Sequence, residues 1–304
     1  CIRKEVKIKT NVLEKNQKLM GLRVKGKPAP DDALLIDLKL KKKQKVMLMG
    51  TAEEEIVVEP PKIDVEIIDD FKEGIDFFEV DLEKNPIYLE KVKRRIFETE
   101  PKMLNDPREG KPLLVLDIDY TIYDCGTTVE VPEEQMRPNL HEFLAESYKH
   151  YDIAIWSATS MKWIDLKLKE MNLLKQPDYK ITFCLDSSAM ITANSERYGV
   201  FVCKPLAVVW ENEKLGKFYT KEKTIMFDDL KRNFCMNPTN GLKIKPWKIK
   251  YLENEDELRG LAKYLRAIKD IDDFNTLDHD DWKKNLSSLR KEEKKRKRDK
   301  EGNE

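Results

Sequence analysis

Short apolar runs that stop abruptly at polar residues dominate the middle of the chain. Leu113–Leu116 contains no polar residue and ends at Asp117, and residues 224–227 end at Asp228 in the same way. Uninterrupted apolar runs of this length are typical of strands in a parallel sheet covered by helices on both faces. Residues 153–156 form a further run of this kind, and the region 201–210 is also strand-like, although it contains Lys204 and Pro205. The pattern predicts an α/β fold.

Apolar residues at helical spacing follow these runs. Leu258, Leu261, Leu265 and Ile268 recur every three or four positions, which predicts a helix over residues 254–269 that packs on the core. Further helices are expected over residues 137–150 and 281–300. Residues 183–202 are expected to form a hairpin beside the mouth of a site at the sheet edge.

Chemically useful side chains sit where the predicted strands end. Asp117, Asp119 and Thr121 follow the first run, Ser157 follows the second, Lys204 lies within the third, and Asp228 with Asp229 follows the fourth. Open α/β sheets bind ligands at the carboxyl ends of their strands. We therefore expect these side chains to meet at one edge of the sheet.

Together these four motifs resemble the haloacid-dehalogenase superfamily, and within it the DxDxT phosphatases that act on the carboxy-terminal domain of RNA polymerase II. The motifs occur in the family order over 113 residues, from Asp117 to Asp229. The resemblance implies a haloacid-dehalogenase-like parallel sheet flanked by helices and a protein serine/threonine phosphatase. The substrate class it implies is a phosphoprotein.

Phosphoester cleavage needs a nucleophile, neutralisation of the phosphoryl charge and a proton for the leaving oxygen. Asp117 is expected to attack phosphorus and form an aspartyl-phosphate, while Asp119 protonates the leaving oxygen and later activates water. A Mg²⁺ ion suits ligands from the Asp117 carboxylate, the Asp119 carbonyl and the Asp228-Asp229 pair. The resemblance assigns the metal contact to Asp229 and a supporting role to Asp228.

The remaining motif residues have charge-stabilising or bracing roles in this interpretation. Ser157 is expected to donate a hydrogen bond to a phosphoryl oxygen, and Lys204 to offset the anionic charge of phosphate and Asp117. Thr121 is expected to brace the Asp119 loop. Only 39 residues separate Asp117 from Ser157, which leaves no room for a cap domain and favours a large substrate.

The first fifty residues resemble ubiquitin. Residues 18–24 and 46–49 are expected to be strands, with a turn at residues 26–28 and a helix over residues 1–12. The β-hairpin that precedes the helix in such a fold is missing from this stretch, and no free di-glycine end follows. The expected role is docking, through a face that includes Leu22, Val24, Lys25 and Lys27.

Charge divides the chain further. Residues 1–51 hold 14 Lys+Arg against 5 Asp+Glu, a net of +9, whereas residues 52–85 hold 3 against 13, a net of −10. We expect a ubiquitin-like domain over 1–51, an acidic linker over 52–85, a phosphatase domain over 86–290 and a charged tail over 291–304. The basic run 294–298 reads either as a solvated helix end or as a nuclear-import signal.

Several classes of protein are disfavoured by the sequence. The longest apolar runs fall far short of the roughly 20 residues that span a bilayer. No P-loop motif, Cys-based phosphatase motif or CxxC pair occurs, and we expect no nucleic-acid partner. The resemblance implies docking to the proteasome regulatory particle in the nucleus. The alternatives are a non-catalytic proteasome adaptor with a phosphatase-like scaffold and a small-molecule phosphatase or phosphotransferase.

Overall fold

The computed structural model describes residues 82–195 and 198–301 without interruption, and side chains as far as Lys291. Before residue 82 it describes short pieces, which are residues 4, 6–7, 9, 18–20, 22–24, 27–29, 38 and 47–49. The chain divides into two compact units, residues 1–62 and residues 63–304.

The first unit contains two antiparallel strand pairs among its described residues. β1 (Lys18–Met20) pairs with β4 (Met47–Met49), and β2 (Arg23–Val24) pairs with β3 (Lys27–Pro28). Strand structure therefore occurs in both expected runs. The expected turn is wrong at its second half, because Lys27 and Pro28 belong to a strand. Most of the expected helix over residues 1–12 lies outside the described residues, and so does Lys25.

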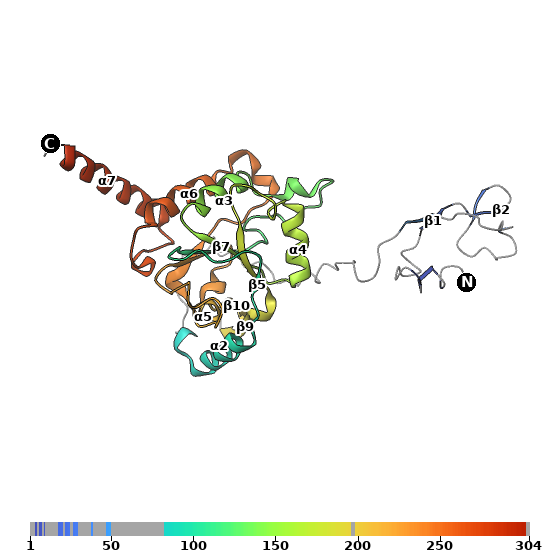
Figure 1. Cartoon of the computed structure of the whole chain (residues 1–304), viewed down its shortest axis with the longest axis horizontal. Helices are drawn as coiled ribbons and strands as arrows, with labels where there is room; N and C mark the ends of the chain where they lie inside the picture. The colour runs from blue at the N-terminus through green and yellow to red at the C-terminus, as the bar shows by residue number, and fades with distance from the viewer. Residues whose placement is uncertain are drawn as a thin grey trace. The chain divides into compact units, whose positions relative to one another are not determined.

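A six-stranded sheet forms the centre of the second unit (Figure 1). Its spatial order is β12-β11-β6-β7-β8-β5, and every neighbouring pair is parallel except β5 with β8. The strands are β5 (Lys102–Met103), β6 (Leu113–Leu116), β7 (Asp152–Trp156), β8 (Ile181–Leu185), β11 (Thr224–Asp228) and β12 (Gly241–Lys243). The predicted α/β architecture with a mostly parallel sheet is confirmed.

Helices cover both faces of this sheet because alternate strand residues point to opposite sides. Leu114 and Leu116 pack with the apolar residues of one set of helices, whereas Leu113 and Val115 pack in a second cluster with α5. The first set is α3 (Leu140–Tyr148), α4 (Met161–Glu170), α6 (Glu257–Ile268) and α7 (Trp282–Glu301). α5 (Ala207–Trp210) is a single short turn on the other face.

Local sequence explains where several helices begin and which side they bury. α2 (Pro86–Glu98) starts at a proline, and the Asn85 side chain caps it by accepting a hydrogen bond from the Ile87 amide at 3.0 Å. The four apolar residues that predicted α6 are all buried. The turns between elements include seven short 3₁₀ segments: η3 (Leu82–Lys84), η4 (Pro132–Gln135), η5 (Ser187–Ala189), η6 (Lys231–Phe234), η7 (Pro238–Asn240), η8 (Ile249–Asn254) and η9 (Phe274–Thr276).

The prediction of a strand-like run over residues 201–210 is wrong in its second half. β10 (Gly199–Cys203) pairs only with β9 (Ile191–Ser195), as an antiparallel hairpin outside the central sheet. After β10 the chain forms a helical turn that begins at Pro205. The Pro205 carbonyl accepts a hydrogen bond from the Val208 amide at 3.0 Å. The expected hairpin is therefore present, although residues 183–185 belong to the central strand β8.

Strand order places the ligand site. From β6 the chain proceeds to β7 and β8 on one side, then returns to β11 on the other side of β6. Loops leaving the carboxyl ends of β6 and β11 therefore diverge, and this reversal creates the crevice where open α/β sheets bind ligands.

Among the described residues, no helix is both long and apolar enough to cross a bilayer.

Candidate active site

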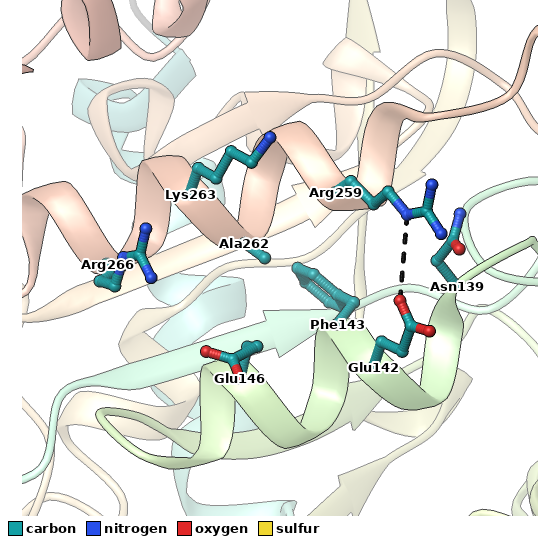
Figure 2. Close-up of a pocket in the computed structure, with 8 residues that line it drawn as sticks. All are labelled: Asn139, Glu142, Phe143, Glu146, Arg259, Ala262, Lys263 and Arg266. Atoms are coloured by element: carbon teal, nitrogen blue, oxygen red, sulfur yellow. Dashed lines mark ion pairs between the residues drawn. The ribbon is translucent and has the colours of Figure 1, made fainter.

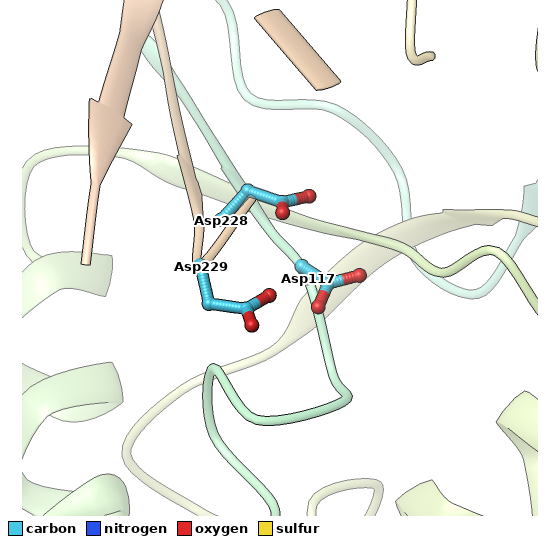
Figure 3. A group of neighbouring side chains, drawn as sticks. All are labelled: Asp117, Asp228 and Asp229. Atoms are coloured by element: carbon cyan, nitrogen blue, oxygen red, sulfur yellow. The ribbon is translucent and has the colours of Figure 1, made fainter. Parts of the chain in front are cut away.

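Three aspartates meet at the carboxyl ends of β6 and β11. Asp117 follows β6 directly, Asp228 is the last residue of β11, and Asp229 comes next (Figure 3). One carboxylate oxygen from each lies within 4.8 Å of the others, and all three residues are buried. The parallel pairing of β6 with β11 brings together two segments that are more than a hundred residues apart in the chain.

A lysine side chain bridges two of these aspartates. The Lys204 Nζ atom lies 2.5 Å from Asp117 Oδ1 and 2.6 Å from Asp228 Oδ2, and the lysine has no exposed surface. It reaches the site because β10 ends at Cys203 and returns the chain to the sheet edge. The Lys204 amide donates to the Asn233 carbonyl at 3.1 Å, which fixes the backbone at this point.

Asp228 and Asp229 occupy different environments. Both oxygens of Asp228 accept from the Asn233 side-chain amide at 2.8 Å, and Oδ1 also accepts from the Leu230 amide at 2.9 Å. With Lys204 added, this carboxylate accepts four hydrogen bonds from three donor groups. No other residue in the described part of the chain donates to the Asp229 carboxylate, which leaves its oxygens available as ligands.

Burial and mutual repulsion shift the acid–base properties of the cluster. Burial raises the pKa of Asp117 to about 8, with the charges of Asp228 and Asp119 adding to it and Lys204 opposing it. Burial, with the charges of Asp228 and Asp117, also raises the pKa of Asp229 well above its usual value. Burial alone would lower the pKa of Lys204, but Asp117 and Asp228 outweigh it and the pKa is raised.

The donor set of this cluster fits a hard divalent cation. One buried ammonium cannot neutralise three converging carboxylates, and oxygen ligands of this kind are those that Mg²⁺ and Ca²⁺ prefer. Asp117 and Asp229 would supply carboxylate oxygens to such an ion, while Asp228 is committed to its nitrogen donors.

The loop that carries Asp119 is held in an unusual backbone conformation. Tyr120 has φ +56°, in the left-handed region that residues other than glycine rarely adopt. Its carbonyl accepts from the Trp247 amide at 2.5 Å, and its amide donates to the Tyr123 carbonyl at 2.7 Å. The hydrogen bonds of Tyr120 with Trp247 and Tyr123 therefore maintain the sharp turn that follows Asp119.

Ser157 lies beside Asp119 at the end of β7. Its hydroxyl donates to Asp119 Oδ2 at 3.3 Å and lies 2.9 Å from the Thr159 hydroxyl. Burial raises the pKa of Asp119, although Lys204 and the Ser157 hydrogen bond oppose the shift. The structure thus brings Asp117, Asp119, Ser157, Lys204 and Asp229 to the same sheet edge that the motif spacing predicted.

Thr121 contributes to the loop through its backbone. Its side-chain hydroxyl is buried and has no hydrogen-bond partner among the described residues, whereas its carbonyl accepts from Arg137 Nη1 at 2.9 Å. The same Nη1 donates to the Lys245 carbonyl at 2.9 Å, and Arg137 Nε lies 2.9 Å from a Glu255 oxygen. The fully buried Arg137 therefore ties the Asp119 loop to the C-terminal part of the domain.

Sequence reasoning missed two residues of this site, Arg137 and Asn233. Neither belongs to a motif, and Arg137 also contacts residues more than a hundred positions away in the chain. One available signal was the placement of Asn233 four residues after Asp229, in a segment already assigned to the site. Arg137 carried no such signal, because an arginine before a proline at a helix start is ordinarily solvated.

Away from the aspartate cluster, a pocket lies between α3 and α6 (Figure 2). It has a volume of about 210 Å³, and Phe143 and Ala262 form its apolar part. An ion pair at 3.9 Å between Arg259 and Glu142 spans it. Its charged residues are opposed in sign, and none of the aspartates of the cluster lines it.

The chain between Asp117 and Ser157 forms no additional domain. It contains the short η4 and the single helix α3, connected by turns. The absence of a cap in this fully described segment agrees with the expectation from its length. The segment between Asp117 and Ser157 therefore places no inserted domain over the aspartate cluster.

Comparison with known proteins places the chain in a family. Residues 112–275 match the family described as NLI interacting factor-like phosphatase. A zebrafish (Danio rerio) protein is 48% identical over 290 residues, covering 94% of this chain and 90% of its own length. A chicken (Gallus gallus) protein matches to the same extent. A human (Homo sapiens) protein is 49% identical over 286 residues, covering 93% and 89%.

All three relatives are named "Ubiquitin-like domain-containing CTD phosphatase 1". A solved structure of a fission yeast RNA polymerase II CTD phosphatase bound to beryllium fluoride covers 71% of this chain and 70% of its own, at 13% identity and a TM-score of 0.33, a likeness too distant to carry an argument. On the family match and the identities, the chain belongs to the NLI interacting factor-like phosphatases, beside the ubiquitin-like domain-containing CTD phosphatases, and it is a protein phosphatase.

Proposed function

We propose that the chain is a Mg²⁺-dependent protein serine/threonine phosphatase that works through phosphorylated Asp117. The observation that carries this proposal is the contact of Lys204 with both Asp117 and Asp228, inside a buried group of carboxylates at the switch point of the sheet. Burying a group of charges of this kind costs stability whether or not it acts chemically, so its presence favours a functional role, and phosphoryl transfer is a reaction that would use it.

In the first step an Asp117 carboxylate oxygen attacks phosphorus and the bond from phosphorus to the serine or threonine oxygen breaks. Asp119, protonated at the start, gives its proton to that leaving oxygen. The Ser157 hydroxyl, which lies beside Asp119, donates to a phosphoryl oxygen, and Lys204 offsets the charge that accumulates there.

In the second step water attacks the phosphorus of the aspartyl-phosphate. Asp119, now a carboxylate, takes the proton from water, and Asp117 leaves as a carboxylate with release of inorganic phosphate. A bound Mg²⁺, with Asp117, Asp229 and the Asp119 carbonyl as its protein ligands, would supply charge neutralisation for the phosphoryl oxygens. Asp228 acts indirectly, because it orients Lys204.

The proposed substrate is a phosphoserine or phosphothreonine in a protein. The uncapped approach to the aspartates supports this, because a small phosphoester gains from a cap that excludes water, whereas a protein segment needs open access. The relatives' names refer to a CTD, so a phosphorylated CTD peptide is the first substrate to test.

The test is release of phosphate from a phosphopeptide by the intact chain with Mg²⁺. Asp117→Asn and Asp119→Asn should each reduce turnover by a factor of at least about 100, since each removes a group that acts in the transition state. Asp106→Asn, an exposed aspartate of the same domain, is the matched control. Near-native turnover by either site variant would exclude these roles, and inactive native protein would favour the non-catalytic adaptor.

A covalent intermediate gives an independent check. Native protein quenched with acid during turnover should carry one additional phosphoryl group, and neutral hydroxylamine should remove it because acyl phosphates react with this nucleophile. Asp117→Asn should carry none. A phosphoryl group that survives hydroxylamine would place the nucleophile on a hydroxyl or imidazole side chain.

The same proposal includes delivery to the proteasome regulatory particle in the nucleus. What supports it is the net charge of +9 in residues 1–51, the half-buried Leu22 before β2 and Val24 within it, and the ubiquitin-like domain in the names of the relatives. The basic run over residues 294–298 supports nuclear import. Localisation of the tagged full chain, with and without substitution of that basic run, tests nuclear import.

A further inference from the structure

The two outer edges of the β9–β10 hairpin differ in what covers them. Along β9, three side chains from α2 reach the strand: Arg95 donates to the Met190 carbonyl at 3.0 Å and Lys91 to the Thr192 carbonyl at 2.7 Å. Tyr88 bonds both the carbonyl and the amide of Asn194, at 3.2 and 3.1 Å. The helix α2 therefore covers this edge and blocks further strand pairing.

These contacts also establish which way the backbone groups of β10 point. In an antiparallel pair, residues alternate between bonding the partner strand and pointing their amide and carbonyl away from it. Because Thr192 and Asn194 point toward α2, their partners Val202 and Val200 must point away from β9 as well. The outward direction is confirmed at Lys204, whose amide reaches Asn233 outside the hairpin.

No hydrogen bond in the described part of the chain uses these outward groups of Val200 and Val202. Both side chains are also exposed, at 74% and 45%. An edge that offers two unpaired amides, two unpaired carbonyls and exposed β-branched side chains is a template for another strand. Native folds ordinarily block such an edge with a charge, a proline or a helix, as α2 does on the other side of this hairpin.

The open edge leads directly into the proposed active site. β10 runs from Gly199 to Cys203, and the next residue is Lys204. The outward groups of Val202 lie two residues, or about 7 Å along an extended chain, from the Lys204 backbone. At that point η6 occupies the edge, so an added strand would end beside the loops that carry the aspartates.

We propose that the outer edge of β10 binds an extended segment of the phosphoprotein substrate as an added β-strand. The amides and carbonyls of Val200 and Val202 pair with the backbone of that segment, and the phosphorylated residue follows within a few positions. This rests on the proposed phosphatase function and specifies how the substrate is held. Recognition through the main chain gives affinity without demanding one sequence, while the exposed valines favour an apolar residue near the phosphosite.

Proline substitution tests the edge without removing a bond of the hairpin. Val202→Pro deletes an outward amide that β9 does not use, whereas Val202→Thr keeps the amide and is the matched control. For the proline variant, the ratio of kcat/KM on a long phosphopeptide to kcat/KM on a small aryl phosphate should fall about 5- to 10-fold, as expected for one or two lost hydrogen bonds. An unchanged ratio would overturn the proposal.

Hydrogen exchange followed by mass spectrometry gives a readout that does not depend on turnover. Adding the long phosphopeptide to the Asp117→Asn protein should slow exchange in residues 199–203 and leave residues 191–195 unchanged. Protection that instead grows with protein concentration, without peptide, would assign the edge to a second copy of the chain and overturn the proposal. If native protein releases no phosphate but the protection occurs, the function fails and the docking edge stands.

Discussion

The ammonium of Lys204 lies 2.5 Å from a carboxylate oxygen of Asp117, although 87 positions separate the two residues in the chain. The contact forms because the hairpin between β8 and Lys204 returns the chain to the sheet edge where β6 ends. Burial strengthens the attraction, and the same burial makes the site intolerant of losing one partner.

Replacing Lys204 by Met should destabilise the fold and abolish turnover. Removing the ammonium leaves Asp117 and Asp228 buried without their cation, which costs about 3–5 kcal/mol in comparable pairs. Thermal unfolding should therefore begin at a lower temperature, and Mg²⁺ should raise the Tm of the variant by more than it raises that of the native chain. Equal shifts in both proteins would show that no divalent cation binds beside Lys204.

The two adjacent aspartates should separate metal binding from stability. Asp229→Asn removes a carboxylate that no other described residue donates to, so the Mg²⁺ concentration for half-maximal activity should rise about tenfold or more with little change in Tm. Asp228→Asn disturbs the bonds to Lys204, Asn233 and Leu230, so its Tm should fall. Titration of both variants with Mg²⁺, beside thermal melts, checks this; reversed behaviour would make Asp228 the ligand.

Arg137 should be needed both for stability and for the position of Asp119. Arg137→Met leaves the Thr121 and Lys245 carbonyls and Glu255 without their donor, at an expected cost of about 2–4 kcal/mol. Arg259→Met, on the exposed surface of α6, should cost less than about 0.5 kcal/mol. Urea unfolding of the two variants makes the comparison. Similar losses would contradict a bracing role for Arg137.

Stability should depend on pH through His279. Burial lowers the pKa of this histidine to about 4, and its Nδ1 lies 2.8 Å from the Tyr264 hydroxyl. The folded state therefore resists protonation that the unfolded chain accepts below its pKa of about 6.5. This contribution is fully present above pH 6.5, and about 3 kcal/mol of it is lost as the pH falls toward 4.

His279→Gln should flatten that dependence, because glutamine does not take up a proton. The free energy of unfolding, measured in urea at several values between pH 7.5 and 4.5, should fall less steeply for this variant than for the native chain. His150→Gln, at a less buried histidine, serves as the control. A slope that does not differ among the three proteins would show that other groups control acid stability.

The proposed docking to the proteasome should depend on charge in the first unit. Lys25→Glu with Lys27→Glu reverses two charges of a segment whose net charge is +9, so co-purification of proteasome subunits with the full chain should weaken severalfold. Added salt should weaken the native association as well. Turnover of a phosphopeptide serves as the internal control. Undiminished recovery of proteasome subunits would place the docking surface in the second unit.

Sequence patterns predicted the parts of this fold that depend on local chemistry. The strands β6, β7 and β11 are each built on an apolar run of three or four residues, and each strand is fully buried as that pattern requires. The prediction of a strand over residues 206–210 is wrong, because the valines in this segment favour a strand whereas Pro205 starts a helical turn. The contacts of Arg137 could not be predicted from the sequence, since one of them joins segments 108 positions apart that only the complete fold brings together, whereas Asn233 lies only five positions from Asp228 and its place in the chain was an available signal.

The loop that carries Asp119 depends on residues that are translated much later than the loop itself. The Tyr120 turn is held by the Trp247 amide, and the Asp124 carboxylate below it accepts from the Ile249 amide at 2.9 Å. A ribosome that has translated both aspartates of the DxDxT motif has still to add well over a hundred residues before these partners exist. The nascent chain thus has the proposed nucleophile long before the loop beside it is oriented, so we expect activity only after nearly the whole domain has left the ribosome.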